Sequence, residues 1–200
     1  RALIKLGRVA EAIDLARRGL ALSQAYGDQV GATFGRHTLG MAMAAQGQWS
    51  VAAVYLQQSL AMGRQSGHRF LHVYSAVQLG RVLLARADTV AAQALFEEAL
   101  DAATRKGGVP YVQLAAVLNS LGMAAQAREE WDLAAQYHRQ ALAQAPYCPA
   151  WEVQDAWYGL AQVYVAQGDW ARARVLLARV AQDRAAAGHF LEVGVLPGGG

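Results

Sequence analysis

Residues 118–142 read LNSLGMAAQAREEWDLAAQYHRQAL and contain each part of a pattern that recurs along the chain. A Leu-Gly pair at 121–122 precedes a short turn that starts at Glu129, and Ala134 follows that start by five residues. Equivalent turns stand at 7–9, 47–49, 87–89 and 168–170, so successive turns start 40, 40, 42 and 39 residues apart. A fixed period of this length is typical of repeat architectures. The sequence therefore predicts an array of similar units.

Three further registers, that is, positions at a fixed distance from the turns, hold similar residues in successive repeats. An alanine stands five residues after each turn start: Ala12, Ala52, Ala92, Ala134 and Ala173. A leucine stands shortly before four of the turns: Leu39, Leu79, Leu121 and Leu160. A helix breaker follows each turn start by twenty residues: Gly27, Gly67, Gly107, Pro149 and Gly188. Small residues at fixed positions are expected where helix axes approach to about 8–10 Å.

Each unit is predicted to be a pair of antiparallel helices. The chain holds 43 alanines among 200 residues, and alanine has the highest helix propensity. Apolar residues recur at helical spacing in the segments 29–46, 49–65, 69–86 and 89–105. Because no single helix can bury its apolar stripe alone, stacked pairs must share one core. We therefore predict an all-α solenoid of helix pairs.

The pattern resembles the tetratricopeptide repeat. The residues that carry the likeness are Leu39-Gly40, Leu121-Gly122, the Gly-x-Trp turns at 47–49 and 168–170, the second-helix alanines and Pro146. The resemblance implies a right-handed superhelix whose first helices line a concave surface. The period is longer than the usual length of about 34 residues. With Gly27-Asp28 and Gly67-His68 after second helices, the long form looks like the MalT-like repeat region of bacterial signalling ATPases and LuxR-type regulators.

The registers also predict repeat boundaries. We expect a partial repeat at 1–27 that is mostly a second helix, complete repeats at 28–67, 68–108, 109–149 and 150–188, and a helix stub with a glycine tail at 189–200. Solenoids need polar caps at their ends. Because Leu3, Ile4 and Leu6 would be poorly covered, we expect that residue 1 is not a natural start and that upstream sequence is missing.

Composition argues against several classes of protein. The net charge is +3 and the arginines are scattered, which disfavours direct nucleic-acid binding. No apolar run reaches the length of a membrane span. Cys148 is the single cysteine and no secretory leader is visible, so a cytoplasmic location is expected.

No residue constellation predicts catalysis, a metal or a cofactor, so we expect a non-enzymatic protein. His68 and His72 are four residues apart, but no third ligand stands at a supporting spacing. Cys148 has no base or cation nearby in sequence to lower the pKa of its thiol. For the lone histidines His37 and His138, packing inside the array is the default interpretation.

The candidate site is the concave surface that the resemblance implies. Residues placed on it by the Leu-Gly register are Phe34, His37, Met41, Tyr74, Val77, Arg81, Asn119, Met123, Asp155, Tyr158 and Gln162. This mixture of aromatic, methionine and polar side chains suits adaptable binding. Packing between helices remains an alternative role for each of them.

Two functions fit this pattern. The leading hypothesis, taken from the resemblance, is the sensor or interaction region of a bacterial signal-transduction or transcription regulator. The alternative is a stand-alone scaffold or adaptor that assembles other proteins. In either case the partner would be a peptide, a protein or a small signal ligand in the concave surface, and a homo-oligomer is possible.

Overall fold

A computed structural model describes residues 2–5, 7–105, 111–148 and 150–187, and within these ranges it contains helices and short turns without a strand. The α-helices are α1 (Ala2–Lys5), α2 (Val9–Ala25), α3 (Gln29–Ala45), α4 (Trp49–Gln65), α5 (Arg69–Ala85), α6 (Thr89–Thr104), α7 (Tyr111–Ala127), α8 (Trp131–Ala143), α9 (Ala150–Ala166) and α10 (Trp170–Ala187). A 3-10 turn, η1 (Ala145–Tyr147), separates α8 from α9. The predicted helix stub at 189–200 lies outside the described residues.

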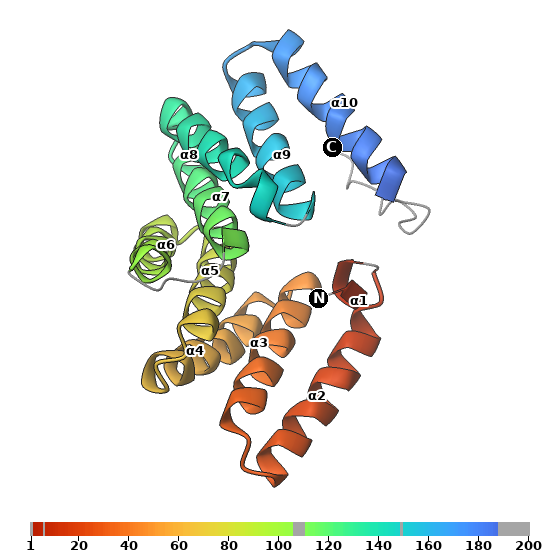
Figure 1. Cartoon of the computed structure of the whole chain (residues 1–200), viewed down its shortest axis with the longest axis vertical. Helices are drawn as coiled ribbons and strands as arrows, with labels where there is room; N and C mark the ends of the chain where they lie inside the picture. The colour runs from red at the N-terminus through yellow and green to blue at the C-terminus, as the bar shows by residue number, and fades with distance from the viewer. Residues whose placement is uncertain (1, 6, 106–110, 149, 188–200) are drawn as a thin grey trace.

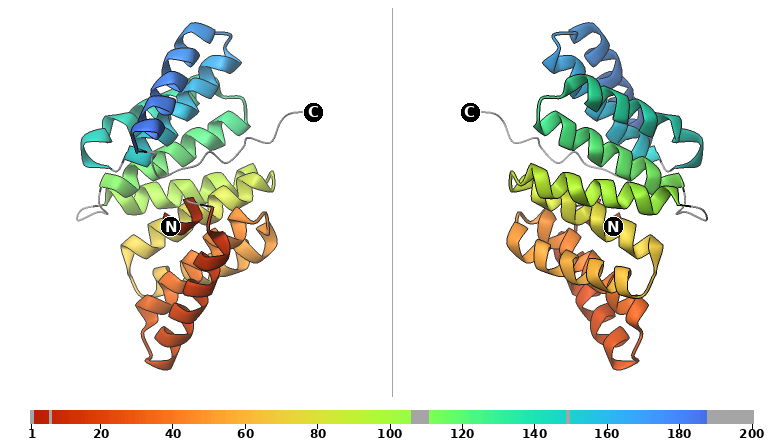
Figure 2. Two further views of the ribbon diagram at one scale, coloured as in Figure 1. Left: turned by 90° about the vertical axis from the view of Figure 1, so that its right-hand side faces the viewer. Right: turned by 90° about the vertical axis from the view of Figure 1, so that its left-hand side faces the viewer.

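The helices stack as consecutive antiparallel pairs along a curved array. Figure 1 shows α4, α6 and α8 on the outer side of the curve, with α3, α5, α7 and α9 inside them. We call α3, α5, α7 and α9 the first helices, and their exposed side the inner face. Each helix packs on the next, and the first helices also pack on one another, α3 on α5, α5 on α7 and α7 on α9. Figure 2 shows the successive pairs fanned along the long axis. The predicted all-α solenoid of antiparallel helix pairs is confirmed.

The recurring turns join each first helix to its second helix. One residue in each turn takes left-handed backbone angles, which only glycine adopts without a steric penalty. Gly47 does so with a φ of 73°, and Gly168 with a φ of 77°. In two repeats the residue at this point is not glycine: Ala87 has a φ of 63° and Glu129 a φ of 60°.

The small-residue registers mark the crossing of the two helices in a pair. All five register alanines are buried: Ala12, Ala52, Ala92, Ala134 and Ala173. A side chain from the second helix packs against the glycine of each Leu-Gly pair. A methyl group on Gly40 would lie 2.5 Å from Cγ of Leu56, and one on Gly80 would lie 2.3 Å from Cε1 of Phe96. The expected need for small side chains at the crossing is confirmed.

Stacking joins these crossings into a shared core. One cluster of buried apolar residues runs from Ile13 on α2 to Ala124 on α7, and smaller clusters continue it through α8, α9 and α10. Among the described helices, none is both long and apolar enough to cross a lipid bilayer.

Candidate functional site

All of the predicted site residues lie on the first helices, but the structure buries some of them. Phe34, Met123 and Tyr158 are the most open of the apolar ones, with 40%, 41% and 42% of their surface exposed. Asp155 and Gln162 are also exposed, while Met41, Tyr74 and Arg81 are partly covered. His37, Val77 and Asn119 are buried. These three can shape the site through packing and hydrogen bonds rather than by broad surface contact.

A cavity of about 310 Å³ brings together six of the predicted residues: Arg81, Asn119, Met123, Asp155, Tyr158 and Gln162. They come from α5, α7 and α9, three consecutive first helices. His138 on α8 and Gly159 on α9 complete its lining. We call this space the α5–α9 cavity. Its size is at the lower limit of ordinary ligand pockets.

The other aromatic residues predicted for the site, Phe34 and Tyr74, form a cluster with Phe70 and His37 farther along the inner face, on α3 and α5. The ring centroids of Phe34 and Phe70 are 6.0 Å apart, and Phe70 stacks on Tyr74 at 5.0 Å. The ring of Tyr74 also lies 5.3 Å from that of His37. Aromatic pairs at these separations stabilise each other beyond simple burial. The cluster therefore forms an ordered, partly open apolar surface.

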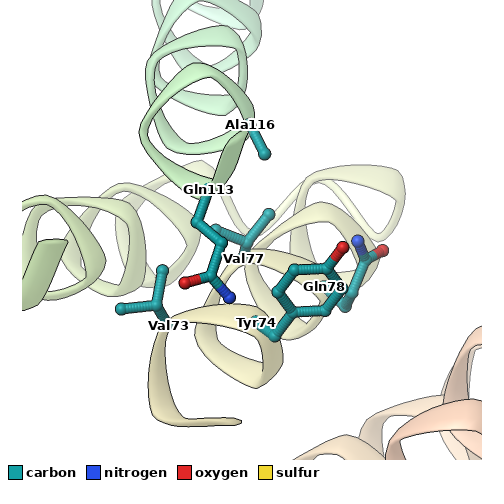
Figure 3. Close-up of a pocket in the computed structure, with 6 residues that line it drawn as sticks. All are labelled: Val73, Tyr74, Val77, Gln78, Gln113 and Ala116. Atoms are coloured by element: carbon teal, nitrogen blue, oxygen red, sulfur yellow. The ribbon is translucent and has the colours of Figure 1, made fainter. Parts of the chain in front are cut away.

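The junction of α5 and α7 between these two regions is closed. Figure 3 shows Gln113 reaching from α7 towards α5, with Tyr74 and Gln78 beside each other near it. Nε2 of Gln113 donates a hydrogen bond to the carbonyl of Phe70 over 3.1 Å. The space lined by these residues is only about 10 Å³, which is the room one water molecule needs. Tyr74 and Val77 thus contribute here to packing between first helices.

His138 forms the floor of the α5–α9 cavity. The amide nitrogen of Asn119 donates to the carbonyl of Glu152 over 3.0 Å, so its Oδ1, 3.2 Å from Nδ1 of His138, is an acceptor. Nδ1 of His138 therefore carries the proton. Burial lowers the pKa of His138 to about 4, so the ring is neutral at pH 7. Among the described residues, Nε2 of His138 has no hydrogen-bond partner.

The sequence-based interpretation of His138 as a packed histidine is confirmed, because its side chain is 1% exposed, but its place in the cavity lining was not predicted. His138 stands four residues after Ala134, where the other complete repeats have Leu56, Phe96 and Leu177. A methyl group on Gly122 or Gly159 would lie 2.6 or 2.3 Å from Cε1 of His138, so the ring is held between α7 and α9. The departure from an apolar register was the available signal.

Two charged side chains of opposite sign line the cavity. Nε of Arg81 donates to Oγ of Ser120 over 2.9 Å, and Ser120 in turn donates to the carbonyl of Ala116. Asp155 stands on α9, on the other side of α7. Within the described ranges, neither Arg81 nor Asp155 makes an ion pair.

The residues weighed earlier for metal binding and nucleophilic chemistry lie elsewhere. Nε2 of His72 is 2.5 Å from Oε1 of Glu98, which also accepts hydrogen bonds from Arg64. Burial alone would raise the pKa of Glu98, but the hydrogen bonds from Arg64 and His72 outweigh it and lower that pKa. Burial, with the nearby charge of Glu152, raises the pKa of the Cys148 thiol. That thiol is therefore not activated.

A curved stack of helix pairs with a lined cavity on its inner face defines a helical-repeat protein. Two tetratricopeptide-repeat models match residues 72–146 and 125–189 of the chain. Together they span 72–189, more than half of the 200 residues. The chain therefore belongs to the tetratricopeptide repeat family, as the resemblance of its sequence predicts.

Solved structures show the same fold at low sequence identity. The TPR-like repeats of a putative kinesin light chain from Podosopora anserina are 21% identical, with a TM-score of 0.64 over 94% of this chain and 92% of that one. BtubC from P. vanneervenii is 18% identical, with a TM-score of 0.64 over 100% and 97%. MamA from Desulfovibrio magneticus RS-1 is 17% identical, with a TM-score of 0.56 over 88% and 97%. No curated protein matches the sequence.

Proposed function

We propose that the chain is a non-catalytic scaffold or adaptor whose inner face binds an extended segment of a partner protein in the cytoplasm. The observation that carries this proposal is the α5–α9 cavity, where residues from three first helices converge. Helical-repeat proteins use their extended curved surfaces for binding. The inner face here offers apolar contact at Phe34, Met123 and Tyr158, and polar contact at Arg81, Asp155 and Gln162.

An extended polypeptide fits the layout better than a compact ligand does. The aromatic cluster lies on α3 and α5, whereas the cavity lies over α5, α7 and α9. The closed junction around Gln113 separates the two regions. A ligand that contacts both must therefore cross several helices, as an extended chain segment does.

The comparisons favour the scaffold over the regulator. The matched region makes up 92% of the kinesin light chain structure and 97% of the BtubC and MamA structures, so the repeat array accounts for nearly all of each solved chain. The regulator role stays a prediction from the resemblance.

Selection of peptides from a displayed random library, followed by binding measurements with variants, tests the proposal. Tyr158→Ala and Phe34→Ala remove exposed aromatic rings from the inner face without cutting into the core. We expect each to weaken binding of the selected peptides about fivefold to tenfold, because each removes more than about 1 kcal/mol of apolar contact.

Val90→Ala on α6 is the matched control, since Val90 is 81% exposed on an outer helix. It should bind the peptides as the parent does. Failure to select any peptide, or equal binding by the parent and Tyr158→Ala, would contradict the proposed function.

A further inference from the structure

The α5–α9 cavity contains one positive and one negative side chain that do not neutralise each other. Arg81 projects from α5 and Asp155 from α9, and α7 packs between these two helices. Neither side chain forms an ion pair within the described part of the chain. Elsewhere several arginines are paired, for example Arg64 with Glu98 and Arg128 with Glu130. The cavity therefore keeps its two charges available.

The rest of the cavity carries no charge. Helix α7, which provides Asn119 and Met123, has no charged residue along its whole length. His138 on the floor is neutral at pH 7, because its ring is buried and donates from Nδ1 to Asn119. Tyr158 and Gln162 are uncharged as well. Arg81 and Asp155 are consequently the two charged side chains among the residues that line the cavity.

Arg81 is also held in place. Its Nε is hydrogen-bonded to Ser120, which is itself anchored to the α7 backbone. Its two Nη groups can donate hydrogen bonds to a carboxylate, because a guanidinium presents several donors in a fixed plane. A positioned cation of this kind loses less entropy on pairing than a freely rotating one.

We infer that the α5–α9 cavity recognises a polypeptide segment that carries both an acidic and a basic side chain, the acidic one paired with Arg81 and the basic one with Asp155. This inference rests on the proposed function and specifies its ligand. The segment lies across α7 with Met123 and Tyr158 in apolar contact. Two charges of opposite sign set its orientation, because the reversed placement would bring like charges together.

Peptides selected on the parent protein provide the probe. We expect them to be enriched in sequences with an acidic and a basic residue at a constant spacing. Replacing the acidic residue of such a peptide with its amide should weaken binding to the parent about fivefold. The same replacement should have little effect on binding to the Arg81→Gln variant. Likewise, replacing the basic residue of the peptide with a neutral one should weaken binding to the parent but have little effect on binding to the Asp155→Asn variant.

Arg81→Lys and Arg139→Gln complete the design. Arg81→Lys keeps the positive charge and should keep the preference for the acidic residue. It therefore separates the effect of losing the charge from the effect of losing the hydrogen bond to Ser120. Arg139→Gln removes an exposed charge on the outer helix α8 and should leave both preferences intact.

The possible failures can be told apart. Peptides that need Tyr158 but show no charge preference, or whose charge preference is unchanged in Arg81→Gln and Asp155→Asn, overturn the inference and leave the scaffold function standing. Peptides that bind independently of Tyr158 overturn both.

Discussion

Nδ1 of His138 and Oδ1 of Asn119 lie 3.2 Å apart in the interior of the array, and both residues are only 1% exposed. The preceding repeat has Phe96 and Val77 at the corresponding positions, and both are buried there too. A polar pair has thus replaced an apolar pair at one crossing of an otherwise regular core. The α5–α9 cavity lies beside this pair.

The His138–Asn119 pair predicts energetic coupling between the two positions. His138→Phe alone leaves Oδ1 of Asn119 buried without its donor, so we expect a loss of about 1–3 kcal/mol in the free energy of unfolding. The double variant His138→Phe with Asn119→Val restores the pair found in the preceding repeat and should recover most of that loss. Urea unfolding of the parent, both single variants and the double variant measures the coupling. Purely additive effects would show that the hydrogen bond does not form.

The lowered pKa of His138 predicts a dependence of stability on pH. The pKa is about 4 in the folded chain against an ordinary value of 6.5, so between these values the unfolded chain binds a proton that the native chain does not. The free energy of unfolding should therefore decrease as the pH falls from about 6.5 to about 4, by on the order of 3 kcal/mol from this group. Below about 4 the group adds no further change.

Unfolding measured across this pH range in the parent and in the double variant isolates the effect of His138. Other titrating groups, Glu98 among them, are common to both proteins and cancel in the difference. Equal pH dependence in the two proteins would rule out a buried neutral His138.

The contact between Phe96 and Gly80 predicts opposite outcomes for two glycine substitutions. Alanine normally stabilises a helix by about 1 kcal/mol relative to glycine. A methyl group on Gly80 would lie 2.3 Å from the buried ring of Phe96, so Gly80→Ala should instead destabilise the protein by about 1–3 kcal/mol. Gly19 on α2 has open space around it, and Gly19→Ala should raise the melting temperature. If both substitutions are stabilising, the packing of α6 on α5 differs from this structure.

The left-handed turn residues Ala87 and Glu129 predict stabilising substitutions. A side chain costs roughly 1–2 kcal/mol in this conformation, while glycine loses more entropy on folding, so a net gain of about 0.5–1 kcal/mol is expected for Ala87→Gly and for Glu129→Gly. The two gains should add, because the turns lie in separate repeats and share no backbone hydrogen-bond partner among the described residues. Ala85→Gly, inside the last turn of α5, is the matched control and should be destabilising. Thermal melts of the three variants decide the matter.

Much of the fold follows from the sequence because its causes are local. The Gly-x-Trp turns predict where second helices begin, and α4 and α10 do begin at Trp49 and Trp170. The alanine and Leu-Gly registers predict the crossings, since a close approach of two helices leaves room only for small side chains. The site residues were placed on the first helices by the Leu-Gly register together with the concave surface that the resemblance to the tetratricopeptide repeat implies.

Exposure along the inner face could not be predicted in this way. His37, Val77, Asn119 and Tyr158 share one register, yet only Tyr158 is open. The following first helix covers each of the others: Tyr74 of α5 lies on His37, α7 closes over Val77, and Glu152 of α9 accepts a hydrogen bond from Asn119. In the described ranges, no further first helix packs on α9.

The sequence by itself determined the period, the helices, the turns and the small residues at the crossings, because these depend on interactions within a few residues or within one helix pair. Only the tertiary structure decided that Arg81 and Asp155 share a cavity and that His138 forms its floor. Those relationships depend on how α5, α7, α8 and α9 pack together. That packing depends on contacts between side chains of separate repeats, and the local periodicity of the sequence does not predict those contacts.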